Sequence, residues 1–212
     1  MTTKDKIWLA VAACSVVGAI AALANGSGTT KRSEKNMNQG KTDVRENRDG
    51  VTNAVFNLNP LNVKVRLDKA KNITRLYPGD ISTAGTTHIM FDSWTNGTAG
   101  AMIHLWRYIN GKVTGDAYPA RTRLDTIEKI VRTWAPTSDP KNDTEGYIRF
   151  VINNLGLFRD AVIPFEEKYI KALVSAMSIQ EDRAAAKFLT PDVMAAAWTV
   201  ATGFVTNQTR FY

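Results

Sequence analysis

Residues 164–182 read PFEEKYIKALVSAMSIQED, and this stretch decides how the rest of the sequence is interpreted. Pro164 suits a first helical position, and Glu166 and Glu167 complement the positive end of a helix. The apolar residues that follow recur at helical spacing, so one face is expected to be buried. The stretch therefore predicts a core helix that ends at a pair of acids, Glu181 and Asp182.

The sequence around this helix predicts four further helices. Each is marked by apolar residues at helical spacing or by a start or stop signal, such as a capping residue, proline or glycine. The signals are Met102, Leu105, Trp106 and Ile109 before Gly111; Leu124, Ile127, Val131 and Trp134 before Pro136; a capping box of Asn142 and Glu145 before Tyr147, Phe150 and Val151, ending at Gly156; and Thr190-Pro191-Asp192, opening a helix to about Thr202.

Strand signals are confined to the region before these helices. Val63, Val65 and Leu67 alternate with polar residues, and residues 73–77 and 88–91 are further short candidates. The predicted fold class is α+β and mainly helical, with a small β-ribbon.

Composition narrows the classes of function. The chain has 212 residues, 44% of them hydrophobic, and a net charge of +7, which is typical of a globular protein with a mildly basic surface. Its one cysteine, Cys14, excludes an internal disulfide and a cysteine-built zinc site. Only His88 and His104 could add imidazole ligands, so no metal or cofactor is expected. The interspersed charges do not indicate a specific nucleic-acid partner.

The N-terminal region differs from the rest of the chain. Residues 7–24 carry no charge and would form a helix about 27 Å long, which is typical of a transmembrane helix. The alternatives are a cleavable signal peptide, with Ala22-Leu23-Ala24 at the cleavage site, and a lipoprotein signal before Cys14. We therefore expect a membrane anchor at 1–26, a flexible polar linker at 27–50 and a folded domain at 51–212.

The catalytic motifs of several enzyme classes are missing from the sequence. There is no nucleophile elbow, phosphate-binding loop or dinucleotide fingerprint. Cleavage of glycosidic bonds needs only carboxyl groups, one of them kept protonated by apolar surroundings. Glu181 meets that description best because it follows the apolar run 172–179. The competing interpretation is a solvated helix end, with Glu181 and Asp182 paired to Arg183 or Lys187.

Five segments, in order across residues 56–182, carry a resemblance to a known family. They are Asn59-Pro60-Leu61-Asn62, Phe91-Asp92-Ser93, Arg132-Thr133-Trp134-Ala135-Pro136, Lys141-Asn142-Asp143-Thr144 and Gln180-Glu181-Asp182. In this order they resemble a family of phage virion structural proteins whose fold is similar to lysozyme-like lytic transglycosylases. The chain departs from the family at Leu61, where the family has glycine, and at Gln180 and Asp182, which flank Glu181 in place of histidine and asparagine.

The resemblance implies a lysozyme-like domain that binds bacterial peptidoglycan and cleaves its glycan strands during entry. Glu181 would be the catalytic residue, and Asn59, Asn62, Gln180 and Asp182 would bind the substrate. With the predicted anchor, the expected location is the virion membrane or the host inner membrane, with lipid and capsid proteins as further partners. Two alternatives remain: a non-enzymatic minor capsid protein, and a cellular inner-membrane protein with a wall-binding domain.

Overall fold

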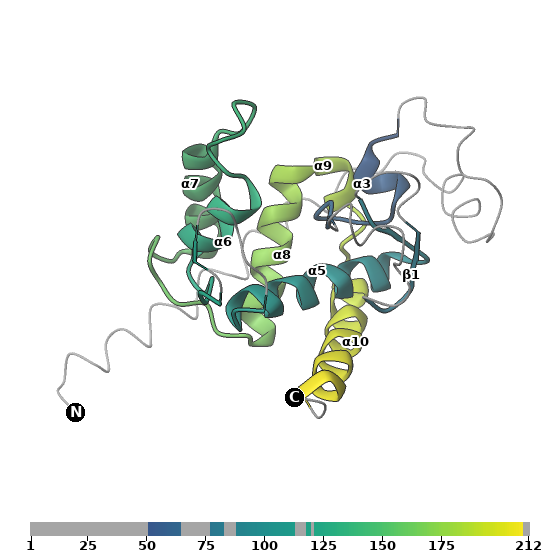
Figure 1. Cartoon of the computed structure of the whole chain (residues 1–212). Helices are drawn as coiled ribbons and strands as arrows, with labels where there is room; N and C mark the ends of the chain where they lie inside the picture. The colour runs from purple at the N-terminus through teal and green to yellow at the C-terminus, as the bar shows by residue number, and fades with distance from the viewer. Residues whose placement is uncertain (1–50, 65–76, 83–87, 113–117, 120, 210–212) are drawn as a thin grey trace.

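Helix α5, Trp94–Ile109, runs across the middle of the molecule, and the other elements are arranged around it (Figure 1). The computed structural model describes residues 51–64, 77–82, 88–112, 118–119 and 121–209. The remaining elements are α3 (Asn53–Phe56), β1 (Asp80–Ser82), β2 (Met90–Phe91), α6 (Ile127–Trp134), α7 (Thr144–Leu155), α8 (Glu167–Glu181), α9 (Arg183–Ala186) and α10 (Pro191–Thr209).

The other helices pack against α5 directly or through intervening helices. Helix α10 makes the most extensive packing with α5, and α8 contacts α5, α7 and α10. Helices α6 and α7 lie together on one side, whereas α3 and the strands lie on the other, where α3 contacts α9 (Figure 1). Buried hydrophobic residues from β2, α5, α6, α7, α8 and α10 form one core, among them Met102, Leu105, Ile130, Ile148, Ile170 and Leu173.

The ribbon is short. Strands β1 and β2 are antiparallel, with an irregularity between Asp80 and Ser82, and an isolated bridge joins Lys64 to His88. The predicted strand at 88–91 is thus confirmed as a paired segment. The candidate strands at 63–67 and 73–77 fall largely on residues 65–76, outside the described residues.

Two predicted helix starts were wrong by a few residues. Asp143, not Asn142, caps α7, because its Oδ1 accepts the Gly146 N–H at 2.8 Å. Helix α8 begins at Glu167, not at Pro164, because Glu166 has an extended backbone and Ile163 donates its N–H to the carbonyl of Asp125. The start of α10 was predicted correctly, and that helix continues to Thr209.

The predicted fold class also contained an N-terminal transmembrane helix, and this part is corrected. Within the described residues, no helix combines the length and the apolar character needed to cross a bilayer. The longest, α10, has 19 residues but exposes Asp192, Thr199 and Asn207. The segment 7–24, on which the prediction fell, and the predicted linker 27–50 lie outside the described residues. The fold class supported by the structure is the mainly helical α+β domain alone.

Two glycines of α5 allow other segments to approach closely, the turn after α3 at Gly97 and strand β2 at Gly100. A Cβ atom on Gly97 would lie 1.7 Å from the carbonyl oxygen of Leu58, and one on Gly100 would lie 2.5 Å from the ring of Phe91. Leu58 itself has a positive φ of 50°, which an L-residue rarely adopts. The contact between α5 and residues 57–62 therefore depends on a missing side chain at position 97.

Gly97→Ala is expected to lower the free energy of unfolding by roughly 3 kcal/mol, because overpacking against backbone is not relieved by a side-chain rotation. The control is Gly203→Ala in α10, where an added Cβ meets nothing within 4 Å and the higher helix propensity of alanine should stabilise by about 0.5–1 kcal/mol. Urea unfolding monitored by circular dichroism measures both. Equal effects of the two substitutions would contradict the close approach.

Candidate functional site

Glu181 is the last residue of α8, and its side chain is largely buried. It lies one turn after Met177 and so shares the face that carries the fully buried Val174 and Met177. This placement excludes the competing interpretation of a solvated helix end. The cation that acts on Glu181 is Lys64, not Arg183 or Lys187.

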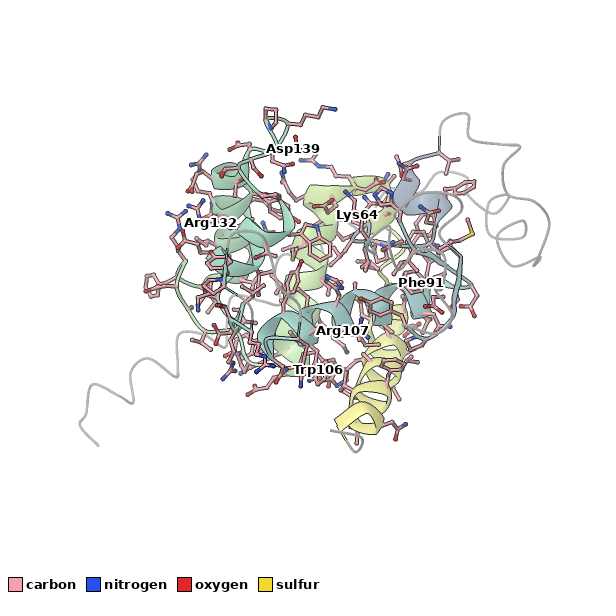
Figure 2. All side chains as sticks on the ribbon, in the orientation of Figure 1. Lys64, Phe91, Trp106, Arg107, Arg132 and Asp139 are labelled. Carbon is pink, nitrogen blue, oxygen red and sulfur yellow. The ribbon has the colours of Figure 1, made fainter. Side chains whose placement is uncertain are left out.

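Three polar side chains favour the charged form of the Glu181 carboxyl group. The groups come from different parts of the chain: Tyr147 from α7, Trp134 from the end of α6 and Asn62 from the segment after α3. Figure 2 labels Lys64, from that same segment, on the side of the molecule where α8 meets α9. The site is therefore assembled by tertiary packing and not by one local motif.

Burial raises the pKa of the Glu181 carboxyl group above its ordinary value. The polar groups of Tyr147, Trp134 and Asn62 and the charge of Lys64 favour the carboxylate and reduce this rise without cancelling it. Glu181 is thus an acid that holds its proton to a higher pH than an exposed glutamate does, yet has partners ready for the charged form.

A cavity of about 210 Å³ opens beside Glu181. Since a cavity of about 150 Å³ can hold benzene, this one has space for a single ring-sized group. Most of its lining side chains are polar, and they come from the α6–α7 loop, from α7 and from the end of α8: Ala135, Lys141, Asn142, Asp143, Tyr147, Gln180 and Glu181.

The structure places only some of the predicted substrate-binding residues at the site. Gln180 lines the cavity, and Asn62 contacts Glu181. Asn59 is fully buried: its Nδ2 donates to the carbonyls of Val63 at 3.0 Å and Ile89 at 2.9 Å, and its Oδ1 accepts the Val63 N–H at 2.8 Å. Both amide hydrogens of Asn59 are used, so its side chain clamps the backbone.

Asp182 also has a structural role, as the cap of α9. Its Oδ1 accepts the N–H groups of Ala184 at 2.8 Å and Ala185 at 3.3 Å, which caps α9. It is not among the residues that line the cavity. Of the five site residues predicted from sequence, Glu181, Asn62 and Gln180 are brought together.

Leucine at position 61, where the resembling family has glycine, causes no backbone strain. Leu61 is fully buried, whereas the positive φ angles of this turn, both 50°, lie at Leu58 and Asn62. Asparagine tolerates the left-handed region better than most residues do. The turn thus presents Asn62 to Glu181 while Leu61 fills the core.

The Trp-Ala-Pro segment and the following loop fasten α6 to α7. The Thr144 hydroxyl donates to the Ala135 carbonyl at 2.6 Å, and the Asn142 side-chain amide donates to the Pro136 carbonyl at 3.1 Å. Trp134 packs edge-on against His104 and Tyr108. This block therefore holds α6 and α7 together beside the cavity.

An ion-pair network stabilises the same pair of helices from outside. Arg132 bonds Glu128 at 2.8 Å within α6 and Glu145 at 2.5 Å across to α7, and Arg159 bonds Glu145. Figure 2 shows Arg132 on this side of the molecule. Glu128 and Glu145 therefore have a structural use and do not face the cavity.

The histidines do not contribute to this site. His104 is buried, its Nδ1 lies 2.7 Å from the hydroxyl of Tyr77, and burial lowers the pKa of His104 to about 3. It therefore stays neutral in the core. Within the part of the chain that the structure describes, no three histidine, cysteine or acidic side chains are grouped as a metal site would require.

Sequence reasoning missed Tyr147, Trp134 and Lys64 as partners of Glu181. The first two were predicted only as apolar core residues. The signal that could have found them is the polar atom of each ring, because a buried Tyr hydroxyl or Trp N–H needs a hydrogen-bond partner. For the exposed Lys64 the sequence contains no such signal.

Comparison with known proteins relates part of the chain to a phage protein. Over 65 residues it is 40% identical to Protein P5 of Pseudoalteromonas phage PM2, a match that covers 31% of this chain and 38% of P5. No protein-family model matches the chain. The match supports the predicted relationship to phage proteins, and it carries no information on a lysozyme-like relationship or an enzymatic activity.

Replacing Glu181 with glutamine should make the protein more stable relative to wild type as the pH rises. A carboxyl group with a raised pKa in the folded state stabilises fully below its ordinary pKa, and this contribution is lost as the pH rises through the folded-state pKa. Glutamine stays neutral, so the difference in unfolding free energy between Glu181→Gln and wild type should grow upward from about pH 4.5 and then level off. Urea unfolding at pH 4, 5, 6 and 7 measures it, and a constant difference would contradict a raised pKa.

Proposed function

We propose that this chain is a virion-associated protein that cleaves the glycan strands of bacterial peptidoglycan, with Glu181 as its general acid. The observation that carries the proposal is a largely buried carboxyl group with a raised pKa beside a polar, ring-sized cavity. The similarity to a phage protein supports a virion-associated role. The ordered segments that resemble the phage virion family support the lysozyme-like assignment.

The reaction needs one carboxyl group that acts twice. Glu181 gives its proton to the glycosidic oxygen as the bond from that oxygen to the anomeric carbon breaks, and the departing sugar leaves with a new hydroxyl group. The substrate's own 6-hydroxyl then bonds to the anomeric carbon, and the Glu181 carboxylate takes the proton that this hydroxyl releases. The product is a 1,6-anhydro sugar, and Glu181 returns to its starting state.

The surroundings of Glu181 suit both halves of this cycle. Burial favours the protonated acid before the bond breaks, and Tyr147, Trp134 and Lys64 stabilise the carboxylate that follows. Asp143, the second carboxylate at the cavity, already caps α7 through its Oδ1. A mechanism in which the substrate supplies the internal nucleophile therefore fits better than one that needs a second free carboxylate.

The charge of the chain also suits this substrate. Peptidoglycan carries carboxylate groups, and the net charge of +7 favours association with an anionic polymer. Lys141 lines the cavity and Lys64 acts on Glu181, so positive charge is present at the site itself.

The purified full-length protein is expected to clear peptidoglycan embedded in a renaturing gel, and Glu181→Gln should lower the rate at least about a hundredfold. The matched control is Glu166→Gln, an exposed glutamate before the first turn of the same helix, which should retain activity. Mass spectrometry of the released fragments should find anhydro ends, one water lighter than hydrolysed ends.

Full clearing by Glu181→Gln would reject the assignment of the acid. Absence of clearing by the wild type would reject cleavage and favour a non-enzymatic structural protein of the virion. Hydrolysed ends in place of anhydro ends would retain glycan cleavage but reject the internal nucleophile.

A further inference from the structure

The side chains that line the cavity beside the proposed acid differ in whether the fold already uses them. Those of Asn142, Asp143 and Tyr147 are bonded to backbone groups of the protein. Lys141 and Gln180 also line the cavity and are exposed, but neither side chain makes a hydrogen bond or an ion pair within the part of the chain that the structure describes. A ligand can therefore engage these two side chains without breaking a contact of the fold.

The α6–α7 loop holds the backbone of Lys141 in place. The Lys141 N–H donates to Oδ1 of Asp139 at 3.0 Å, and the Asn142 N–H donates to the Asp139 carbonyl at 3.0 Å. The Asp139 N–H in turn donates to the Pro136 carbonyl at 3.2 Å. Figure 2 labels Asp139 at the top of the view, where this loop extends beyond the helices. The loop thus fixes where the Lys141 side chain begins, and binding has to order only the rotamers of that side chain.

The charges around the cavity leave Lys141 as the group that meets an anion. The acidic residues in the lining are Asp143 and Glu181. The Asp143 carboxylate accepts the Gly146 N–H at the positive end of α7, which offsets its charge. Burial raises the pKa of Glu181, so its neutral form persists to a higher pH than in an exposed glutamate. Lys64 adds further positive charge near that carboxyl group.

We propose that Lys141 is a specificity-determining residue that binds a carboxylate carried by the sugar ring in the cavity. The inference rests on the proposed function and names the ring that the site prefers, one with an acidic substituent over the same ring without it. The cavity of about 210 Å³ has space for one ring-sized group, so a carboxylate that Lys141 contacts belongs to the ring bound beside Glu181. In peptidoglycan, alternate sugars carry a lactyl ether that ends in a carboxyl group.

Lysine suits this substituent because a lactyl ether rotates about its own bonds. The lysine ammonium is a compact charge with three donors on a flexible stem, so it needs no fixed two-pronged geometry. The amide of Gln180 has both donors and an acceptor, which match the N–H and carbonyl of an acetamido group. Both alternating sugars of peptidoglycan carry an acetamido group, so Gln180 is assigned to what the sugars share and Lys141 to what distinguishes them.

The test compares two tetrasaccharides that differ only in the acidic substituent. One is chitotetraose, made of N-acetylglucosamine alone, and the other is a peptide-free peptidoglycan tetrasaccharide in which alternate rings carry the lactyl ether. The full-length Glu181→Gln protein is the background, because glutamine keeps a neutral side chain at this position and removes the proposed acid. Dissociation constants are measured by titration of the nitrogen-15-labelled protein, followed by the amide NMR shifts.

In this background, Lys141→Gln should weaken binding of the peptidoglycan tetrasaccharide about threefold to tenfold, as expected for an exposed charge-assisted contact. Binding of chitotetraose should change by less than about twofold. Lys141→Arg keeps the positive charge and should retain the preference, whereas Gln180→Ala should weaken both tetrasaccharides alike. The preference of the background protein should also shrink as salt is added, because exposed charges are screened.

Lys187→Gln is the matched control. Lys187 is an exposed lysine after α9 that does not line the cavity, and it makes no ion pair with any residue that the structure describes. Its replacement removes the same charge from the chain and should leave both dissociation constants unchanged. Equal losses in Lys187→Gln and Lys141→Gln would overturn the proposal, and so would a Lys141→Gln variant that binds both tetrasaccharides as the background protein does.

A kinetic measurement separates the proposal from the proposed function. With Glu181 intact, Lys141→Gln should raise KM for peptidoglycan with little change in kcat, because the contact is made before and during bond cleavage. If Lys141 discriminates the tetrasaccharides but the wild type releases no fragments from peptidoglycan, cleavage is rejected and the specificity of the site stands. If fragments are released while Lys141→Gln and Lys187→Gln behave alike in binding, the specificity is overturned and cleavage stands.

Discussion

The side-chain amide of Asn59 is the interaction on which the candidate site depends. By donating to the carbonyls of Val63 and Ile89 and accepting the Val63 N–H, it joins the turn after α3 to the chain that enters β2. The Val63 carbonyl also accepts the Ile89 N–H at 3.0 Å, so the two segments are joined by a backbone bond as well as by the side chain. The turn held in this way presents Asn62 and Lys64 to Glu181, so a residue that no substrate can reach still determines the geometry of the acid.

The opposite wall of the site is held by different means. Helices α6 and α7 meet through the bond from Thr144 to the Ala135 carbonyl and through ion pairs from Arg132 and Arg159 to Glu145. These ion pairs are partly exposed, so each contributes modestly and weakens in salt. The buried hydrogen bond and the packing of Trp134 are the more persistent constraints. Together they hold Trp134 and Tyr147 beside the Glu181 carboxyl group.

The helical architecture could be predicted because it depends on local signals. Apolar spacing located the cores of α5 to α8, and Thr190-Pro191-Asp192 located the start of α10. The starts of α7 and α8 were misplaced because Asp143 and not Asn142 is the cap of α7, and because the extended backbone of Glu166 delays α8 until Glu167. Glu181 was identified because its apolar helix is contiguous in sequence. Its partners were not, since Tyr147 and Lys64 are brought to it only by the packing of distant segments. The transmembrane part of the fold class was wrong for the described residues, where no helix is suited to span a bilayer.

The break between α8 and α9 separates two neighbouring acids that differ by one methylene group. Glu181 ends α8, where the free carbonyl groups of the last turn concentrate partial negative charge and oppose a second anion. Asp182 is the cap before α9, where two free backbone N–H groups, those of Ala184 and Ala185, donate to its carboxylate. One peptide link thus divides a largely buried acid with a raised pKa from an acid that caps the next helix, so exchanging the two identities would leave composition and charge unaltered but put each side chain in the other's surroundings.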